Sequence, residues 1–455
     1  MVNIVPFRGI LYNRKKIKPL NSVVAPPYDV ISGAGQDEYY LKDNYNIVRL
    51  IYGKDLPWDD DSTNNRYIRS DRYFKDWLKK EVLIRDSNPC IYIYRQEYSI
   101  PPHIGYTHRE DGDRKRIRNG FIALLRLEEF GKGDIFPHEE TLSQPKEDRL
   151  QVLRRCRANF SQIFGVYSDP QMNIDDLMEM EMKREPTVNI TDDEGDRHYL
   201  WAVTDVETQN KIISEIRDKK ILIADGHHRY ETAITYRNEI RSKFPDFTGR
   251  EPYNYIMTYL TNSDTEGLTI LPTHRLIKNL PSFNKEEVER KIEEHFSIES
   301  FPFDKDKGDE QDKRIDMFRK MEERSKKGHI FGMYFGDNRY LLLSLRDEGI
   351  LDEIVDRSRC EEWRLLDVTI LHAFLIERIL NISGDSIADQ RNITYVTDEE
   401  EVIRSMEEGG YQAAFFLSPT RIEEVKRIAM KGERMPQKST FFYPKLLTGL
   451  VINKL

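Results

Sequence analysis

The chain has 455 residues, and its 79 Asp and Glu outnumber its 70 Lys and Arg, so its formal net charge is −9. Aromatic residues make up 11% of the chain, more than a disordered protein carries, so we expect a folded protein of about three structural units. The acidic balance disfavours a general nucleic-acid binder, because neutralising phosphates needs clustered cations. The apolar runs fall well short of the ~20 residues of a membrane-spanning helix, so we expect no membrane partner.

The N-terminus and the cysteines bear on the cellular compartment. Residues 1–7 lack the basic region and the apolar core of a secretory signal. Cys90, Cys156 and Cys360 are widely spaced and odd in number, which fits neither a disulfide framework nor a metal-ligand set. Both observations favour a reducing, cytoplasmic location.

The first region, residues 1–120, is rich in Tyr and Pro and is predicted to be an α+β unit. The apolar run Val23–Ala25 ends at a pair of prolines, which exclude a helix and predict an extended segment that enters a turn. Ile91–Tyr94 and Phe121–Leu125 have the composition of strands. Residues 109–118 mix basic and acidic side chains, which favours a solvated hairpin or loop, with phosphate binding as the alternative.

The central region, residues 121–280, alternates short strands with helices. Apolar residues at helical spacing mark 146–156, and Tyr199–Val203 is a strand candidate. Lys220–Ala224 is an apolar strand that leads directly into the sequence Asp-Gly-His-His-Arg. This alternation is typical of an α/β or α+β fold.

The last region, residues 281–455, is predicted to be a second α+β unit. It begins with an amphipathic helix around Lys285–Phe296, and Val368–Leu380 also has a helical pattern. Ala413–Leu417 has the composition of a core strand. We therefore expect mixed sheets with flanking helices, in three regions that fold separately or pack as one continuous assembly.

The strongest local signal is the strand-to-helix junction Asp225–Arg229. An apolar strand ends there, Gly226 permits a tight turn or a close ligand, and we expect Asp225 to cap the following helix. The first turn of such a helix offers free N–H groups to an anion, next to two imidazoles and a guanidinium. A simple helix cap is the alternative, but it leaves two adjacent histidines beside an arginine unexplained.

The expected helix also carries one candidate pair of metal ligands. His228 and Glu231 are three residues apart on the expected helix, so both side chains could reach one cation. No third ligand follows at a suitable spacing, so we assign no metal-ligating residue. The cation that we expect is a Mg²⁺ that arrives with a nucleotide, because it needs only one or two carboxylates.

A second polar group spans His138–Thr141 and continues to Lys146. It combines an imidazole, two carboxylates, a hydroxyl and a lysine next to a glycine-containing turn. Such a set can supply a general base and a phosphate contact. The alternative is that these residues are only the polar start of a helix.

A third segment carries the sequence Lys-Ser-Thr from residue 438. This sequence resembles the end of a phosphate-binding loop, but Gln437 stands where such a loop requires glycine. We therefore reject the standard phosphate loop and keep Lys438 as a candidate anion contact.

Five segments together resemble the family catalogued as domain of unknown function 1015. They occur in the family's order and extend along the whole chain, so the chain is identified as a member, although membership alone implies little chemistry. The segments are Val24–Ser32, Pro137–Glu139, Ala224–Ala233, Leu271–Arg275 and Gly432–Gly449.

The Asp-Gly-His-His-Arg junction also resembles the phosphate-binding corner of the ParB and sulfiredoxin superfamily. Members bind nucleotides there and include free-serine kinases, CTP-dependent partition proteins and sulfiredoxin. The reactive cysteine of sulfiredoxin would fall at His227, so its redox chemistry is not expected, and the Asp-Gly-His-His form is closer to the kinases. The resemblance implies a central ParB/sulfiredoxin-like nucleotide-binding unit, in which Glu139 or Glu140 takes the part of the kinases' glutamate base.

These observations favour a nucleotide-dependent small-molecule phosphotransferase of the serine or phosphoserine kinase type, with ATP or ADP and Mg²⁺. Two alternatives stay open: a nucleotide-binding switch or adaptor without transfer chemistry, and a ParB-like nuclease or DNA-binding protein, against which the acidic charge argues. The candidate residues are, for catalysis, Asp225, His227, His228 and Glu139, and, for cofactor binding, Gly226, His228, Arg229, Lys146 and Lys438.

Overall fold

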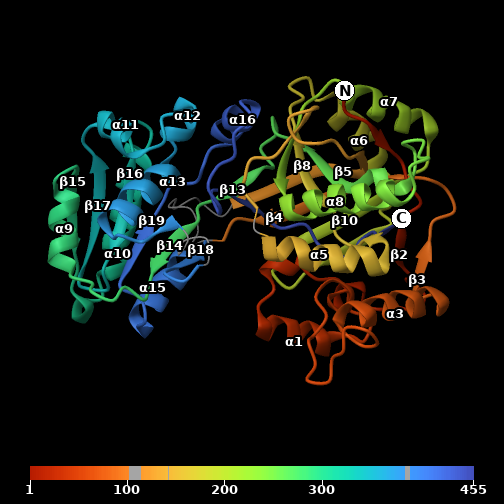
Figure 1. Ribbon diagram of the computed structural model, residues 1–455, viewed down its shortest axis with the longest axis horizontal. Coiled ribbons are helices and arrows are strands. Elements are labelled where there is room, and N and C mark those ends of the chain that lie inside the picture. Colours follow the sequence, from red (N-terminus) through yellow and green to blue (C-terminus); the bar gives the residue numbers. More distant parts are fainter. Residues whose placement is uncertain (102–113, 142, 385–389) are drawn as a thin grey trace.

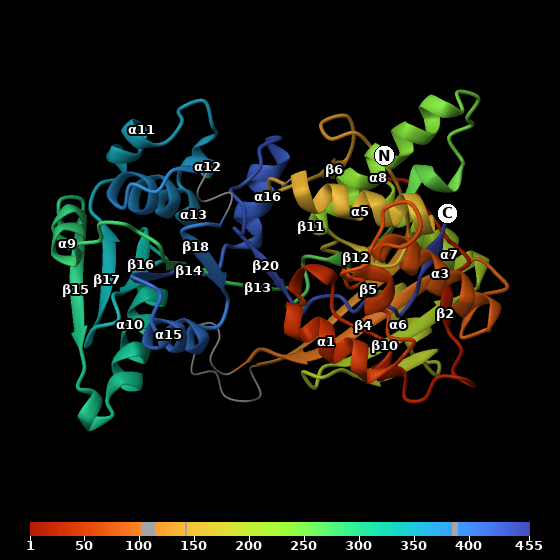
Figure 2. The ribbon, with the colours of Figure 1, turned by 60° about the horizontal axis from the view of Figure 1, so that its bottom comes forward.

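The computed structural model describes residues 1–101, 114–141, 143–384 and 390–455. Figure 1 shows two bodies side by side, each built on a sheet that helices flank, and Figure 2 shows both after a rotation. The prediction of mixed sheets with flanking helices is confirmed. Within the described residues, no helix is both long enough and apolar enough to cross a membrane.

The larger sheet has nine strands in the order β6-β11-β8-β12-β5-β4-β10-β9, with β1 paired to β5. β11 runs parallel to β6 and β12 runs parallel to β8, whereas the other pairs are antiparallel, so the sheet is mixed. The strands are β1 (Ile4–Val5), β4 (Ile91–Ser99), β5 (Lys115–Arg126), β6 (Ile135–Phe136), β8 (Ile163–Tyr167), β9 (Val188–Thr191), β10 (Arg197–Val203), β11 (Ile221–Asp225) and β12 (Tyr255–Asn262).

The helices of this body pack on the larger sheet and beside it. A buried apolar cluster joins one sheet face to three of them through Ile174, Ile212 and Tyr230. The helices are α1 (Gly33–Lys42), α2 (Val48–Ile51), α3 (Arg66–Lys79), α5 (Ser143–Cys156), α6 (Asn173–Met182), α7 (Val206–Ile216) and α8 (His227–Lys243).

The smaller sheet has six strands in the order β15-β17-β16-β19-β14-β18, all paired antiparallel. The strands are β14 (His274–Ile277), β15 (Phe296–Pro302), β16 (Ile330–Tyr334), β17 (Arg339–Leu345), β18 (Ile393–Val396) and β19 (Ala413–Phe416). The helices are α9 (Lys285–Glu293), α10 (Glu310–Arg324), α11 (Leu351–Ile354), α12 (Glu361–Arg364), α13 (Asp367–Ile370), the π-helical η6 (Leu371–Ile379), α15 (Glu399–Glu408) and α16 (Ile422–Met430).

Three short strand pairs stand outside the two main sheets among the described residues. β13 (Thr269–Leu271) pairs with β20 (Phe441–Tyr443), and both lie between the two bodies in Figures 1 and 2. β2 (Ile10–Tyr12) pairs with β3 (Leu83–Arg85), and β7 (Ala158–Asn159) pairs with β21 (Asn453–Lys454). One buried apolar cluster includes residues of both main sheets, among them Tyr94 and Phe415.

The larger sheet takes strands from both residues 1–120 and residues 121–280. The division into three regions stays a prediction. One strand begins earlier than its apolar run indicated: β5 starts at Lys115, because Arg118 is buried there by hydrogen bonds to Gln96 and to backbone carbonyls. The rest of the predicted hairpin or loop, residues 109–113, lies outside the described residues.

Candidate functional site

The corner between β11 and α8 has the predicted strand-turn-helix form. Gly226 has φ +92°, in the left-handed region that favours glycine, and a Cβ placed on it would lie 3.0 Å from the guanidinium of Arg229. Gly226 is the N-cap of α8, so the expectation that Asp225 caps this helix is wrong: Asp225 is the last residue of β11. Among the described residues, no side chain caps this helix, so its first-turn N–H groups can bind an anion.

Asp225 is held by two cations instead. Its Oδ2 accepts a hydrogen bond of 2.6 Å from Nη2 of Arg229, and its Oδ1 accepts one of 2.8 Å from Nζ of Lys445. Burial raises the pKa of Asp225, but Lys445 and Arg229 outweigh burial and hold the pKa well below its usual range. Nη1 of Arg229 donates to the carbonyl of Gln162 at 2.6 Å, so this guanidinium positions Asp225 and the neighbouring loop.

Two buried histidines form the floor of the corner. The backbone N–H of His138 donates to Nε2 of His227 at 3.2 Å, and the two rings meet edge to face with centroids 4.6 Å apart. Nδ1 of His138 lies 2.6 Å from the carbonyl oxygen of Ile223, so Nδ1 carries the proton, and Nε2 accepts from the hydroxyl of Thr440 at 2.8 Å.

Both of these histidines are neutral near pH 7. Burial lowers the pKa of His138 to about 4, and burial together with His138 lowers the pKa of His227 well below its usual value. The structure therefore places the predicted catalytic residue His227 in the corner, as a buried hydrogen-bond acceptor.

Glu139 and His228 lie in one charged group with Lys438. The backbone N–H of Lys438 donates to Oε1 of Glu139 at 3.0 Å. Burial raises the pKa of Glu139, and Lys438 opposes the rise. Burial lowers the pKa of the half-buried His228, and Glu139 and Asp29 oppose that change. Glu139 therefore has the properties of a proton acceptor that Asp225 lacks.

Glu231 joins a further pair of cations to the first turns of α8. Its Oε2 accepts from Nζ of Lys146 at 3.0 Å and from the hydroxyl of Thr141 at 2.7 Å, and its Oε1 accepts from Nη1 of Arg434 at 2.9 Å. Burial raises the pKa of Glu231, but these partners lower it below its usual value. In the described parts of the chain, no group of three His, Cys, Asp or Glu side chains could hold a metal ion.

Residues 435–445 bring these groups together. Met435 donates its backbone N–H to the carbonyl of His138 at 2.7 Å, Lys438 binds Glu139, Thr440 binds His138, and Lys445 binds Asp225. Thr440, Arg434 and Lys445 are absent from the sequence-based candidates. All three lie within the family-like segment Gly432–Gly449, and Thr440 also ends the Lys-Ser-Thr sequence, so these two signals could have found them.

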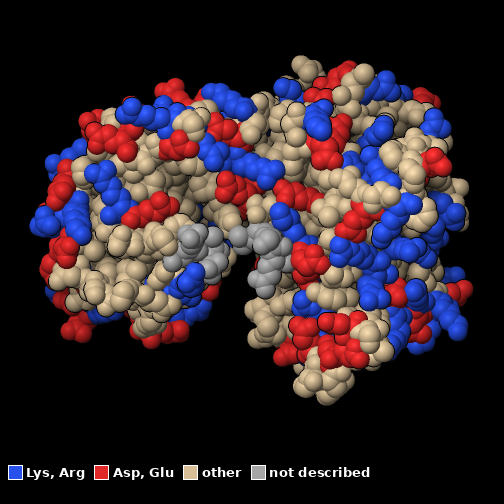
Figure 3. Space-filling model, in the orientation of Figure 1, with Lys and Arg blue, Asp and Glu red and all other residues tan. Residues whose placement is uncertain are grey.

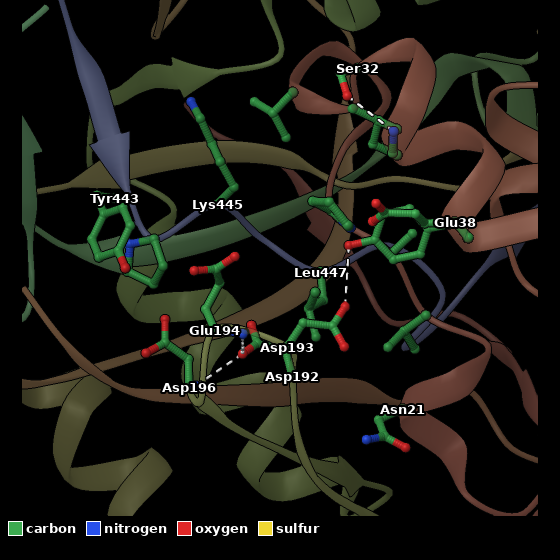
Figure 4. Close-up of a pocket in the computed structure, with 18 of the residues that line it drawn as sticks. Asn21, Ser32, Glu38, Asp192, Asp193, Glu194, Asp196, Tyr443, Lys445 and Leu447 are labelled. Carbon is green, nitrogen blue, oxygen red and sulfur yellow. Dashed lines mark hydrogen bonds between the residues drawn. The ribbon is translucent and has the colours of Figure 1, made fainter. Parts of the chain in front are cut away.

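A cavity of about 390 Å³ adjoins the corner at Lys445. Figure 4 shows its acidic wall, formed by Asp192, Asp193, Glu194 and Asp196 on the turn between β9 and β10, facing the segment that carries Lys445. Burial raises the pKa of Asp196 to about 7, and Asp192 adds to the rise. This cavity is large enough for a small organic ligand.

The chain was compared with curated sequences, with solved structures and with family models. No curated protein sequence matches the chain. Among solved structures, the chain is similar to a free serine kinase in complex with AMP, with TM-score 0.33 and 12% identity over 68% of this chain and 83% of the other. It is also similar to C-terminally truncated SbnI from Staphylococcus aureus (TM-score 0.34, 10% identity, 72% and 85%) and to a conserved hypothetical protein from Pyrococcus furiosus (TM-score 0.31, 14% identity, 68% and 87%).

One family model covers most of the chain. It matches residues 4–369, which include four of the five segments named above and end before Gly432–Gly449. The chain therefore belongs to the family described as protein of unknown function, DUF1015.

Proposed function

We propose that this protein is a nucleotide-dependent phosphotransferase that acts on a hydroxyl group of a small molecule. The observation that carries the proposal is the arrangement around the start of α8, where the first turn offers its N–H groups and where His228 of that turn interacts electrostatically with Glu139, a carboxylate of raised pKa, and with Lys438. Phosphoryl transfer depends mainly on positioning and on neutralising phosphate charge, and this arrangement supplies both.

The phosphates of ATP or ADP would bind at the first turn of α8. The N–H groups of that turn, His228 and Lys438 supply donors there. Asp225 and Glu231 are each bound by two cationic side chains, so they fit poorly as direct metal ligands. The residues present fit a Mg²⁺ that is held mainly by phosphate oxygens, where it would neutralise phosphate charge.

Glu139 is the proposed general base. The hydroxyl proton of the acceptor passes to Glu139, and the hydroxyl oxygen forms a bond to the terminal phosphorus. The bond between that phosphorus and the bridging oxygen breaks, and its electron pair leaves with the shortened nucleotide. Asp225 is a positioning residue, because its low pKa makes it a weak base and its two ion pairs fix the corner.

Turnover with defined acceptors tests the proposal. The resemblance of the corner to free-serine kinases makes serine, and phosphoserine for the reverse direction, the first compounds to use. We expect product with ATP or ADP from the wild type, a large loss in Glu139→Gln, and wild-type turnover in Glu140→Gln, whose side chain is 52% exposed. We also expect weaker nucleotide binding in His228→Ala.

The other outcomes separate the alternatives. A nucleotide that raises the melting temperature without any product would support a switch or adaptor. A wild type that neither binds a nucleotide nor forms product would overturn the proposal. A salt-dependent gel shift would support a DNA-binding protein. Such a protein needs clustered cations, whereas Figure 3 shows acidic and basic side chains interspersed over both bodies on the face displayed.

A further inference from the structure

Arg275 is a buried guanidinium in the segment Leu271–Arg275, which the proposed chemistry does not use. Its side chain lies on β14 and the residue is 1% exposed. Nη1 donates to the carbonyl of Thr273, Nη2 donates to the carbonyl of Lys438 at 3.1 Å, and Nε has no partner among the described residues. No carboxylate within the described residues pairs with it.

The other buried arginines of the described chain each donate a hydrogen bond to an acceptor on another side chain. Arg118 donates to the amide oxygen of Gln96, Arg149 to the carboxylate of Asp148, and Arg237 to the carboxylate of Glu129. Each therefore has a side-chain acceptor, as a structural arginine requires. A buried charge without one is costly, so its retention at Arg275 points to a ligand that supplies the missing acceptor.

Three residues near this guanidinium also carry a buried polar atom without a partner in the described structure: Oγ1 of Thr273, Nε2 of His372 and Oη of Tyr395. Tyr395 is the cross-strand neighbour of Arg275 on β18, and the guanidinium lies 5.4 Å from its ring centroid. His372 lies in the first turn of η6, and π-helical turns are frequent at functional sites. Together these groups can donate several hydrogen bonds to one oxyanion.

Lys438 connects this cluster to the general base. Its carbonyl accepts from Arg275, and its N–H donates to Glu139. One residue of backbone therefore separates the guanidinium from the carboxylate that would receive the hydroxyl proton. A small molecule with a hydroxyl group at one end and an anionic group at the other can span that separation.

We propose that Arg275 binds the carboxylate of a hydroxy acid acceptor, with further hydrogen bonds from Thr273 and Tyr395 and a contact from His372. A carboxylate matches the single positive charge of Arg275 and the planar fork of its donors. A phosphate dianion would leave one negative charge buried beside Glu139. The assignment of the bound molecule as the phosphoryl acceptor rests on the proposed function; carboxylate binding itself does not.

Calorimetry and thermal shift on the full chain, with and without ADP, test the site. The probes are L-serine, 3-hydroxypropionate, ethanolamine, which lacks the carboxylate, and inorganic phosphate. We expect the wild type to bind the two carboxylates. We expect Arg275→Gln to weaken that binding by about 10- to 100-fold, the effect of losing a charge-assisted hydrogen bond.

Two further variants keep the test independent of folding. Tyr395→Phe removes a hydroxyl without a partner, so we expect a melting temperature at or above that of the wild type but about tenfold weaker carboxylate binding. Tyr167→Phe removes another buried hydroxyl, in the larger sheet, that has no partner in the described parts of the chain, and should leave that binding unchanged.

The outcomes distinguish this site from the proposed function. The inference is overturned if no carboxylate binds at millimolar concentration, or if ethanolamine binds as well as serine. It is also overturned if only phosphate binds through Arg275, or if both Arg275→Gln and Tyr395→Phe bind carboxylates with wild-type affinity. Carboxylate binding that depends on Arg275, without turnover by any nucleotide, would support the site and overturn the phosphotransferase.

Discussion

Substitution of Lys445 by Met removes one of the two cations that bind Asp225. Both side chains of that pair are 15% exposed, so solvent screens the interaction weakly. Leaving a buried charge wholly unpaired costs ~3–5 kcal/mol. Arg229 stays bound in this variant, so we expect the free energy of unfolding to fall by about 2 kcal/mol, as for one hydrogen bond to a charged group.

The pH dependence of this loss identifies its origin. The pKa of Asp225 is depressed in the folded protein, so the pair stabilises it fully above the unfolded pKa of ~3.9, and this stability is lost as the pH falls toward the folded pKa. Without Lys445 the folded pKa is higher, so less stability is lost on acidification. The difference between wild type and Lys445→Met is therefore largest, and constant, above the folded pKa that Asp225 has in the variant, and it narrows as the pH falls below that value. A series from about pH 7 down to about pH 2 covers this change.

Urea unfolding over this pH range measures the effect. Lys454→Met, which changes an exposed lysine nearby in the sequence, is the matched control and should alter stability by less than ~0.5 kcal/mol. In the double variant Asp225→Asn, Lys445→Met, the loss of unfolding free energy should be smaller than the sum of the two single losses, because both substitutions remove the same ion pair. A cost in Lys445→Met equal to that of the control, or one that does not vary with pH, would refute the ion pair.

Three further predictions concern the same corner. Glu139→Gln should lower turnover by about 10²- to 10⁴-fold and keep nucleotide affinity in a thermal-shift titration; equal turnover would exclude a base at this position. The pKa of His138 falls from 6.5 in the unfolded chain to about 4 in the folded protein, which corresponds to about 3 kcal/mol of unfolding free energy at ~1.36 kcal/mol per pH unit. This stability should be fully present above pH 6.5 and should decline as the pH falls toward 4. Urea unfolding should show a less steep decline in His138→Gln. Gly226→Ala should lower the free energy of unfolding by about 1–3 kcal/mol, because the φ of this residue is +92° and the new Cβ crowds Arg229. The same substitution should weaken nucleotide binding. Unchanged stability in urea unfolding, or unchanged nucleotide affinity in a thermal-shift titration, would contradict the prediction.

The local form of the corner followed from the sequence, but its electrostatics did not. An apolar run, a glycine and polar residues at a helix start are neighbours along the chain, so they predict the junction between β11 and α8. Lys445 is 220 positions from Asp225, and Thr440 is 302 positions from His138. No periodicity or spacing along the chain indicates a contact over such a separation. Its neighbours in the sequence therefore predicted a helix cap for Asp225, and the ion pair with Lys445 could not be predicted.

Charged residues also made two features hard to predict from the sequence: the start of β5 and the burial of Arg275. The basic residues at the start of β5 indicated a solvated loop, yet Arg118 is buried because carbonyl oxygens from β20 and the residue after it accept its hydrogen bonds. Arg275 lies in the family-like segment Leu271–Arg275. Only its burial and an Nε without a partner among the described residues distinguish it from a surface arginine, and the sequence shows neither.

The position of residues 435–445 also sets the order in which the site can form during synthesis. At ~5–20 residues per second, Lys445 leaves the ribosome about 10–45 s after Asp225. Until then the carboxylate of Asp225 lacks one of its two cations, and His138 lacks the hydroxyl of Thr440. The nascent chain therefore cannot complete its candidate active site before almost all of the described sequence has been translated.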